Sequence, residues 1–492
     1  VPTISLGEPF LHPTSMLFRN LMAVDTEEMI RAQPLDAVVL MGGCDKTVPA
    51  QLMGAASAGV PAISLVAGPM MTGAYQGERL GACTDCRRLW GEYRGGRIDD
   101  EAIRNIEGQL MPTAGTCMVM GTASTMACIV EALGMMVPGG ASAPAAFADR
   151  LRVGVESGRY AVAMAAKQLT PDKIMTPKAF ENAIRVLLAI GGSTNAVIHL
   201  TAIAGRMGIA LDPNIFDRLS EDTPLLMNLK PSGKYYMEDF HQAGGMRVLL
   251  QQLKPKLHLD CLTITGQTLG EWLGGDAKHP EWQDVIFPAK APLQDKGGLV
   301  VLRGNLAPDG AVLKRSAASP ELMKHEGRAV VFTSLDDMAE RLDADDLDVK
   351  ADDVLVLQNA GPIGAPGMPE SGYIPIPKKL ARQGVKDMVR ISDARMSGTA
   401  FGTIVLHISP ETAVGGALGL VRTGDRIALD ADKRLLELKV DAAELERRRK
   451  TWKAPVHPPE RGYLRLHLDQ VEQAHLGCDL RFLRPQPKVT LK

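Results

Sequence analysis

The 492 residues are 45% hydrophobic, 23% charged and 4% aromatic, and their formal net charge is −2. This length accommodates roughly two or three domains, while the balanced charge and the few aromatic residues exclude a surface built for nucleic acid or anionic membranes. The seven cysteines are odd in number and widely scattered, which excludes a disulfide framework and indicates a reducing compartment. We therefore expect a cytoplasmic protein without a nucleic-acid or membrane partner.

The first half alternates short apolar runs with helical patterns. Residues 35–41 and 62–67 are continuous apolar runs of strand length, and each ends at glycine-containing sequence. Asp25 with Glu28 three residues later has the spacing of a helix-capping box. Strands that alternate with helices predict a parallel sheet covered on both faces, with its chemistry beyond the carboxyl ends of the strands. Residues 44–46 follow such an end.

The chain changes character after residue 269. Residues 270–296 are rich in Gly, Pro, Lys and Asp and are predicted to be a linker. Beyond them, short apolar runs bounded by turn residues predict strands at 298–302, 329–332, 353–357, 388–391, 403–408 and 426–429, with a hairpin connection at 429–433. The predicted fold class is an α/β domain, residues 1–269, whose parallel sheet is flanked by helices, followed by a β-rich domain, residues 297–492, that is either β-barrel-like or a sandwich.

Cys44-Asp45-Lys46 places a thiol, a carboxylate and an amine in consecutive positions. Thiolates suit iron–sulfur clusters and carboxylates suit magnesium, so this run predicts the meeting point of two metal sites. Cys117 follows a Gly-Thr turn and is a second candidate thiolate ligand. Taken alone, each cysteine is also typical of a small packed residue at the end of a strand or the start of a helix.

Cys83 and Cys86 form a CxxC pattern, which suits a redox pair or half of a zinc site. No second CxxC and no matching pair of histidines accompany it in the sequence. Cys128 lies within an apolar helical run, where packing explains it.

Two loops of the second half carry more polar groups than a turn requires. Residues 359–370 end at Glu370, and residues 392–399 contain Ser397 and Thr399. On composition alone, each loop is also typical of a solvated connection.

Together, these segments resemble the family of dihydroxy-acid, phosphogluconate and aldonic-acid dehydratases. The resemblance covers essentially the whole chain and rests on ordered motifs: residues 43–49 (GCDKTVP), 112–117 (PTAGTC), 121–126 (GTASTM), 190–195 (IGGSTN), 361–370 (from GP to PE), 392–398 (SDARMSG) and 477–479 (GCD). It implies an α/β domain followed by a barrel, assembled into a homodimer or homotetramer. It also implies an iron–sulfur, magnesium-dependent hydro-lyase that converts a small polyhydroxy acid into a 2-keto-3-deoxy acid.

The resemblance implies roles for individual residues as well. The resemblance implies that Cys44 and Cys117 are two of the three cysteines that hold a [2Fe–2S] cluster. The implied magnesium ligands are Glu8, Asp45, Glu370 and Lys46, the last as a lysine carbamylated by carbon dioxide. Ser397 is implied to be the catalytic base with Thr399 beside it, and the implied substrate contacts are Ser193, Thr194 and Asn195.

These groups suit dehydration. Hydroxide is a poor leaving group, and an iron with an open position can act on it as a Lewis acid. Magnesium on the carboxylate and 2-hydroxyl would neutralise the charge that develops when the C2 proton is removed. A serine is a weak base at its free pKa, so nearby cations must favour its alkoxide.

Residues 13–20 (PTSMLFRN) resemble the aldonic-acid branch, because the branched-chain amino-acid enzymes typically carry a His-Glu-Gly segment there. We therefore expect a sugar acid such as arabinonate, xylonate or galactonate. One alternative is the dihydroxy-acid dehydratase of branched-chain amino-acid biosynthesis. Another is a non-catalytic acid-binding relative, against which the joint presence of Lys46, Glu370 and Ser397 argues.

The family's third cluster cysteine lies upstream of the Glu8 region, and no such residue precedes Glu8 in this sequence. Two explanations are open: an N-terminal segment preceding these residues, which we expect, or another cysteine in this role. On the first explanation, residues 1–492 alone should hold the cluster poorly. The CxxC cysteines, Cys83 and Cys86, are expected to be dispensable because the family motifs place no cysteine there.

Overall fold

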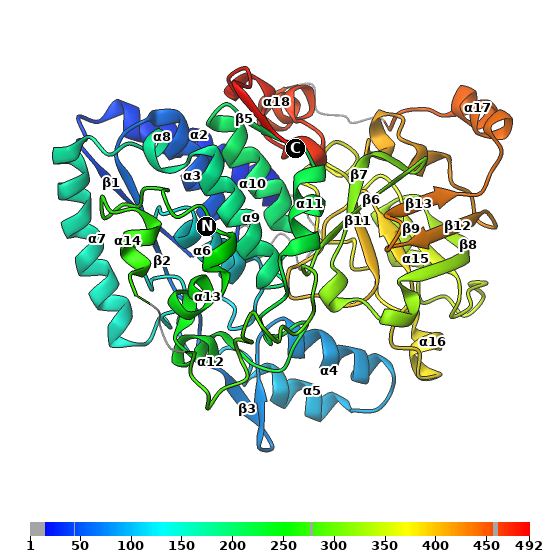
Figure 1. The fold of residues 1–492 in the computed structure, drawn as a ribbon. Coiled ribbons are helices and arrows are strands. Elements are labelled where there is room, and N and C mark those ends of the chain that lie inside the picture. The colour runs from blue at the N-terminus through cyan, green and yellow to red at the C-terminus, as the bar shows by residue number, and fades with distance from the viewer. Residues whose placement is uncertain (1–14, 44, 276–278, 456–460) are drawn as a thin grey trace.

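The computed structural model describes residues 15–43, 45–275, 279–455 and 461–492. Helices surround a small parallel sheet in the N-terminal half, and a closed barrel lies beside it in the C-terminal half (Figure 1). The mixed α/β character, the parallel pairing and the barrel predicted from the sequence are confirmed at this level. Within the described ranges, no helix is long and apolar enough to cross a membrane.

The parallel sheet joins β1 (Val38–Gly42) to β2 (Ala62–Val66), with Gly42 opposite Val66. Both strands coincide with apolar runs predicted from the sequence. Helix α3 (Thr47–Ala58) connects them, as a parallel pair requires, and packs on the sheet together with α7 (Ala148–Lys167). The described sheet has these two strands, so it is smaller than a doubly wound sheet. Its carboxyl edge leads directly into Asp45 and Lys46.

The first described helix corrects one prediction. Helix α2 spans Ser15–Ala32, so Asp25 lies inside a helix and does not begin one. Helix α2 packs against α3, and this tertiary packing overrides the local capping pattern.

The other helices of this half have ordinary local causes. Helix α9 (Pro177–Ala189), for example, starts with a proline, and the Thr176 side chain accepts a hydrogen bond from the backbone of Ala179. Helices α9 and α10 are almost entirely buried and form the centre of the core. The remaining bounds are α6 (Thr122–Ala132), α8 (Pro171–Ile174), α10 (Asn195–Arg206), α11 (Asn214–Asp222), α12 (Met237–Gln242), α13 (Gly245–Leu253) and α14 (Leu269–Leu273).

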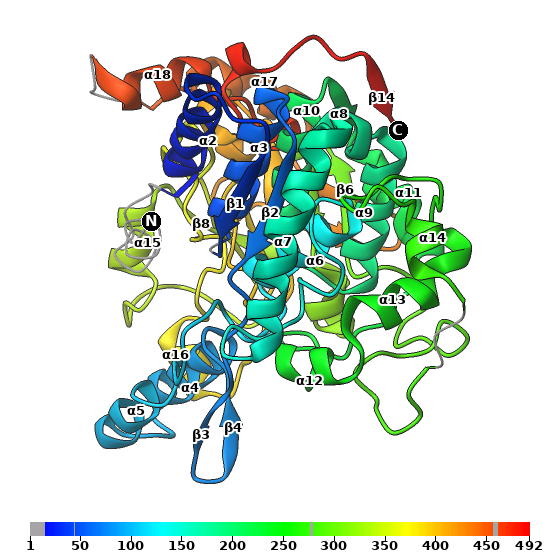
Figure 2. The ribbon, with the colours of Figure 1, turned by 90° about the vertical axis from the view of Figure 1, so that its left-hand side faces the viewer.

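A small lobe projects from the N-terminal half (Figure 2). It consists of the antiparallel hairpin β3 (Gly73–Tyr75) and β4 (Glu78–Leu80), followed by α4 (Thr84–Arg94) and α5 (Asp100–Glu107). Helix α4 also contacts α16 (Lys378–Arg382), which belongs to the barrel half. The lobe therefore bridges the two halves.

Eight strands close the barrel in the order β10-β11-β7-β6-β13-β12-β8-β9. Their interior is filled by valine, leucine, isoleucine and alanine. The bounds are β6 (Val300–Gly304), β7 (Ala307–Leu313), β8 (Lys324–Phe332), β9 (Val354–Leu357), β10 (Arg390–Ser392), β11 (Ile404–Ser409), β12 (Arg426–Asp430) and β13 (Leu435–Leu438). The predicted strands match six of these, and the predicted hairpin joins β12 to β13 with Asp430 opposite Leu435.

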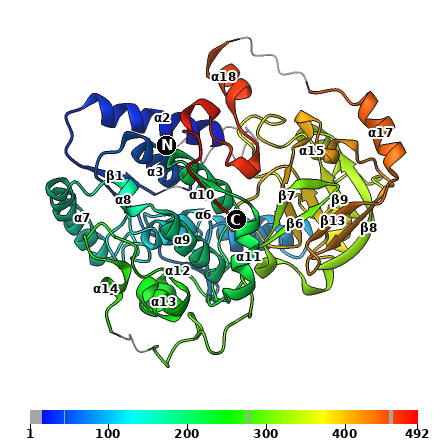
Figure 3. The same ribbon diagram turned by 45° about the horizontal axis from the view of Figure 1, so that its top comes forward.

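Two further segments connect the halves. Helix α14 occupies residues 270–273, at the start of the stretch 270–296 that was predicted to be a linker without an element. Residues 274–275 and 279–296 have no helix or strand, and Ile286 there is buried and bridges Met227 of the N-terminal half. After α15 (Leu335–Arg341), α17 (Ala442–Thr451) and α18 (Gly462–Gln470), the C-terminal segment returns to the N-terminal half (Figure 3). There β14 (Val489–Leu491) pairs in parallel with β5 (Ile209–Leu211).

Candidate active site

The predicted charged residues meet beyond the carboxyl end of β1. Lys46 precedes α3 and is 1% exposed. Its Nζ donates a hydrogen bond to Oδ2 of Asp45 and another, of 3.2 Å, to Oε1 of Glu370. Glu370 comes from a loop of the barrel half, so this ion pair joins residues 324 positions apart. The structure thus brings together three of the residues that the sequence assigned to magnesium.

Glu370 Oε1 also accepts hydrogen bonds from Nδ2 of Asn195, at 3.0 Å, and from Nη1 of Arg395, at 2.6 Å. Burial by itself would raise the pKa of Glu370, but the positive charges of Lys46 and Arg395 outweigh burial and lower the pKa to about 2. Glu370 is therefore an anion throughout the physiological pH range.

Ser397 and Thr399 lie together on the loop between β10 and β11. Their side-chain oxygens are 2.8 Å apart, and the carbonyl of Thr399 accepts a hydrogen bond of 3.0 Å from Oγ1 of Thr84. Gly398 fits between them because a Cβ there would lie 2.6 Å from Cβ of Ser193. This close approach fixes the loop against the N-terminal half.

A buried chain of polar groups connects this loop to Glu370. Oγ1 of Thr122 is 2.8 Å from Oγ of Ser193 and accepts a hydrogen bond of 3.2 Å from Nδ2 of Asn195, the same nitrogen that donates to Glu370. Ser193, Thr194 and Asn195 are fully buried at the start of α10. Their contact with substrate remains a prediction, whereas the observed bonds show that Asn195 orients Glu370. Among the described residues, Oγ1 of Thr194 and Oδ1 of Asn195 have no hydrogen-bond partner.

Cys117 lies beside a cysteine that the sequence did not connect to it. The Sγ atoms of Cys83 and Cys117 are 3.5 Å apart. The hydrogen bond with Cys117 lowers the pKa of the Cys83 thiol, burial opposes this change, and Arg87 reinforces it. Cys86 lies in a different apolar cluster, and burial raises the pKa of its thiol. The two remaining predicted ligands, Cys44 and Glu8, lie outside the described residues.

Arg395 was missed as an individual site residue, although it lies in the motif at 392–398. Its guanidinium is fully buried and contacts Glu370 as well as Oγ of Ser15, at the start of α2. An arginine in a polar loop is usually solvated. The motif was therefore the available sequence signal for Arg395, and its contact with Glu370 forms only in the folded chain.

The motif at 477–479 holds the C-terminal segment against helices of the N-terminal half. The carbonyl of Cys478 accepts hydrogen bonds from Arg19 and Asn20 of α2, and Asp479 pairs with Arg206 of α10. Cys478 is buried, as are two further cysteines, Cys128 and Cys261. Burial raises the thiol pKa of all three, which suits the packing expected for Cys128.

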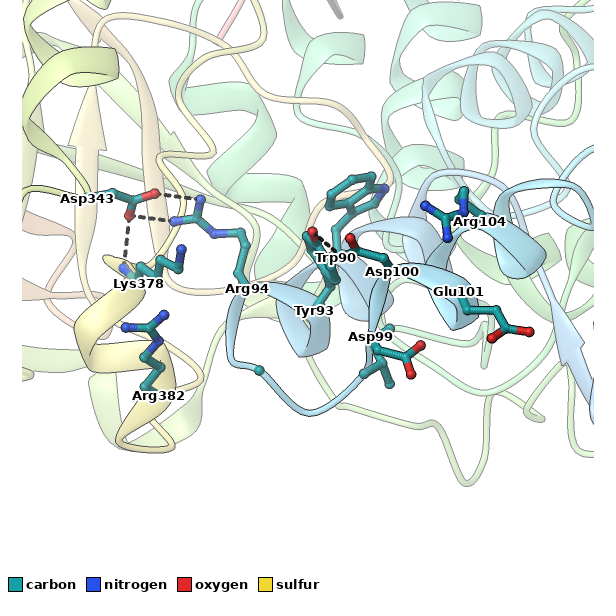
Figure 4. A pocket seen from close by; sticks show the side chains of 12 residues that line it. Trp90, Tyr93, Arg94, Asp99, Asp100, Glu101, Arg104, Asp343, Lys378 and Arg382 are labelled. Carbon is teal, nitrogen blue, oxygen red and sulfur yellow. Dashed lines mark hydrogen bonds and ion pairs between the residues drawn. The ribbon is translucent and has the colours of Figure 1, made fainter.

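A groove of about 760 Å³ lies elsewhere, between α4, α5 and α16 (Figure 4). Trp90, Tyr93 and Arg94 line it, and Arg94 forms two hydrogen bonds to Asp343, of 2.8 and 2.7 Å. The groove shares no residue with the charged cluster around Glu370. The charged residues around Glu370, where ionised and hydrogen-bonded groups converge, are therefore the candidate active site.

Comparisons with known proteins identify the family of this chain. Residues 2–272 match the family model of the dihydroxy-acid/6-phosphogluconate dehydratase N-terminal region, and residues 284–478 match the corresponding C-terminal model. Both halves thus match models of dehydratases, enzymes that eliminate water from their substrates. The chain belongs to the dihydroxy-acid/6-phosphogluconate dehydratase family.

Individual relatives are similar over nearly the whole chain. An L-arabonate dehydratase of Azospirillum brasilense is 50% identical over 491 residues, which cover 98% of this chain and 84% of that protein. An L-arabinonate dehydratase of Rhizobium leguminosarum bv. trifolii is 49% identical over 486 residues, with the same two coverages. A 6-deoxy-6-sulfo-D-gluconate dehydratase of Pseudomonas putida is 45% identical over 498 residues, covering 99% of this chain and 86% of that protein.

Proposed function

We propose that this enzyme dehydrates a sugar acid, most specifically a pentonate such as arabinonate, to the 2-keto-3-deoxy acid. The observation that carries the proposal is the anionic Glu370, held by Lys46, Asn195 and Arg395 where both halves meet. The sugar-acid substrates in the names of the relatives at 45–50% identity support the substrate class.

The donors at this position fit magnesium. Asp45 and Glu370 offer carboxylate oxygens, the ligands that a hard divalent cation prefers. Glu370 is already ionised, so binding of a cation does not require it to lose a proton. Arg395 and Asn195 would hold the Glu370 carboxylate in place.

The thiols fit an iron–sulfur cluster. Cys117 is partly exposed, as expected of a thiol that must bind an inorganic group, whereas Cys128, Cys261 and Cys478 are buried. When bound, the cluster and magnesium supply Lewis acids for the leaving 3-hydroxyl and for the substrate carboxylate.

Ser397 then removes the C2 proton through Oγ. The Thr399 hydroxyl, 2.8 Å away, can donate a hydrogen bond to the Ser397 alkoxide and so favour it. Loss of the C2 proton and of the 3-hydroxyl as water gives an enol, which becomes a ketone when a proton returns to C3. The close contact between Gly398 and Ser193 fixes the position of the neighbouring Ser397.

Lys46 is proposed to carry a carbamate. Carbon dioxide adds to the neutral amine, with loss of a proton, and turns a cation between two carboxylates into a further anionic oxygen ligand. Crystals grown with bicarbonate and magnesium should show density beyond Nζ. An ammonium still paired with Asp45 and Glu370 in an active, magnesium-loaded crystal would exclude the carbamate.

Turnover assays with arabinonate, xylonate, galactonate and 2,3-dihydroxy-isovalerate test the function, with 2-keto acid formation as the readout. We expect the highest kcat/KM for a pentonate. A clear preference for dihydroxy-isovalerate would move the chain to the amino-acid branch, and no turnover by cluster-loaded enzyme would favour a non-catalytic relative. A cytoplasmic homodimer or homotetramer remains our prediction for its location and assembly.

A further inference from the structure

Lys314 is a fully buried lysine that reaches the loop of Ser397. It follows β7, and its Nζ donates a hydrogen bond of 3.4 Å to the carbonyl of Gly398. The turn that begins at Lys314 is tied to the same loop, because the amide of Gly402 donates a hydrogen bond of 2.8 Å to the carbonyl of Ala317. The amine is thus held against the residue that follows Ser397.

No neighbouring charge balances the Lys314 amine among the described residues. Burial alone lowers its pKa, to about 7. The strands and loops around Lys314 carry titratable side chains that contribute nothing to this change, namely Arg303, Asp309, Arg315, Asp393, Arg395 and His407. A methionine would fill the same space without the cost of burying an amine, so packing alone does not explain a lysine here.

The hydrogen bond from Lys314 reaches a peptide group that also contacts Ser397. The carbonyl of Gly398 and the amide N–H of Thr399 belong to this one peptide group, and the N–H donates a hydrogen bond of 3.4 Å to Oγ of Ser397. A positive charge beside the carbonyl oxygen strengthens the N–H as a donor, because hydrogen bonds in a chain polarise one another. Lys314 can therefore act on Ser397 through a single peptide group.

We propose that Lys314 is a positioning residue for proton removal: its ammonium group, acting through the peptide between Gly398 and Thr399, favours the alkoxide of Ser397. This inference rests on the proposed function, in which Ser397 is the base. The Thr399 hydroxyl, which also contacts Ser397, is neutral, so Lys314 adds a positive charge that the hydroxyl does not supply. A charge acts more strongly in a buried site than in water.

The proton balance of this step needs no outside acid or base. The pair of Lys314 and Ser397 loses one proton as the pH rises through about 7, where the amine titrates. The remaining proton is on Oγ of Ser397 in the resting form and on Nζ of Lys314 in the reactive form, so activation breaks an O–H bond and forms an N–H bond. Below pH 7 both groups are protonated and the alkoxide is absent. We therefore expect kcat to rise with pH to about 7 and to level off above it.

The experiment compares wild type with Lys314→Met and Lys314→Gln, all loaded with cluster and magnesium, from pH 6 to pH 9.5. The substrate is the pentonate with the highest kcat/KM. Lys314→Met should lower kcat at pH 8 by roughly 10²-fold and leave KM nearly unchanged. Its kcat should also keep rising to pH 9.5, because a serine without the nearby cation ionises only at high pH. Lys314→Gln, which keeps a hydrogen-bond donor without the charge, should behave in the same way.

Two further measurements separate this role from a structural one. Because Lys314 acts through Ser397, the double variant Ser397→Ala/Lys314→Met should turn over no more slowly than Ser397→Ala. Equilibrium unfolding of wild type and Lys314→Met across the same pH range measures the pKa of the amine without turnover, and this pKa should agree with the kcat profile. Lys178→Met, at an exposed lysine, is the control and should keep the wild-type profile.

Wild-type kcat at pH 8 in Lys314→Met or Lys314→Gln would overturn the role of Lys314 and leave the proposed function standing. A double variant slower than Ser397→Ala by the full factor measured for Lys314→Met would overturn it as well, since independent effects multiply. Wild-type kcat in Ser397→Ala would remove the proposed base and this inference with it. If wild type dehydrates no acid, the proposed function and this inference both fail.

Discussion

Ser397 has a position that suits a base without contributing much to the fold. Its side-chain hydrogen bonds are to Thr399, two residues away, so removing Oγ disturbs little else. We expect Ser397→Ala to lower kcat by roughly 10²-fold or more, as for loss of a general base, with an unchanged melting temperature. Steady-state kinetics and thermal unfolding measure the two effects.

Ser334→Ala is a suitable control for that variant. Ser334 caps α15 by accepting a hydrogen bond from the amide of Asp337, outside the proposed active site. Its loss should destabilise the protein by about 1 kcal/mol and leave kcat unchanged. A Ser397→Ala enzyme with most of the wild-type kcat would remove Ser397 from the mechanism.

Lys314 gives a prediction about pH. It is fully buried after β7, its Nζ donates to the carbonyl of Gly398 at 3.4 Å, and burial lowers its pKa from 10.5 to about 7. Between pH 7 and 10.5 the unfolded chain binds the extra proton, so this residue's contribution makes stability rise with pH across that window. Below pH 7 the buried charge has its full destabilising effect, about 1.4 kcal/mol for each unit by which the pKa is lowered.

We therefore expect Lys314→Met to be more stable than wild type at pH 6, by several kcal/mol, with the difference shrinking towards pH 9.5. Urea unfolding at several pH values measures it. Lys178→Met, at an exposed lysine paired with Asp260, should show no such trend. A pH-independent difference for Lys314→Met would show that its amine is not the titrating group.

At the residue scale, the sequence identified the charged residues of the site, which lie in short motifs. Asp45, Lys46 and Glu370 were predicted separately and do meet. Arg395 could not be identified as an individual site residue, because what distinguishes it is its contacts with Glu370 and Ser15, which lie elsewhere in the sequence. The local sequence gives the identity of a side chain, whereas the residue that this side chain contacts depends on the fold.

At the scale of elements, the GCD motif fixes the C-terminal segment to the N-terminal half. Asp479 receives hydrogen bonds of 2.5 and 3.0 Å from Arg206, and both side chains are fully buried. Asp479→Ala leaves a buried guanidinium with only its weaker partners, so we expect a loss of about 3 kcal/mol in the free energy of unfolding. Chemical denaturation measures this loss.

The exposed pair between Lys178 and Asp260 is the matched control. Asp260→Ala should change stability by less than about 0.5 kcal/mol, since water solvates the remaining charge. Similar losses in both variants would mean that burial does not govern the strength of these pairs.

The elements themselves were predictable where one local signal dominates. Runs of β-branched and aliphatic residues located most barrel strands. Strand β7 was missed because Pro308, Asp309 and Gly310 resemble a turn, although the strand pairs with β6 and β11. Pairing with these two neighbours closes the barrel and supplies backbone hydrogen bonds that the composition of β7 does not predict. The helix start predicted at Asp25 was wrong for a similar reason, because packing against α3 stabilises α2 on both sides of that residue.

At the scale of the whole molecule, the proposed magnesium site exists only when both halves are folded together. Asp45 and Lys46 follow β1, whereas Glu370 and Arg395 belong to the barrel half. A cation that binds the folded chain alone stabilises it by RT ln(1 + [L]/Kd), about 2.7 kcal/mol at a hundredfold excess over Kd. Magnesium should therefore raise the melting temperature by a few degrees, and chelation should reverse the rise.

Glu370→Gln separates this linkage from other effects of magnesium. The substitution removes the anionic ligand contributed by the barrel half and leaves the fold of each half in place, although Lys46 and Arg395 lose a charged partner. The absolute melting temperature of the variant is then a poor guide, and the change on adding magnesium is the quantity to compare. We expect that change to disappear in Glu370→Gln and to persist in Glu326→Gln, at an exposed carboxylate on β8. An equal magnesium-dependent rise in all three proteins would place the cation elsewhere and show that the junction of the two halves is not its site.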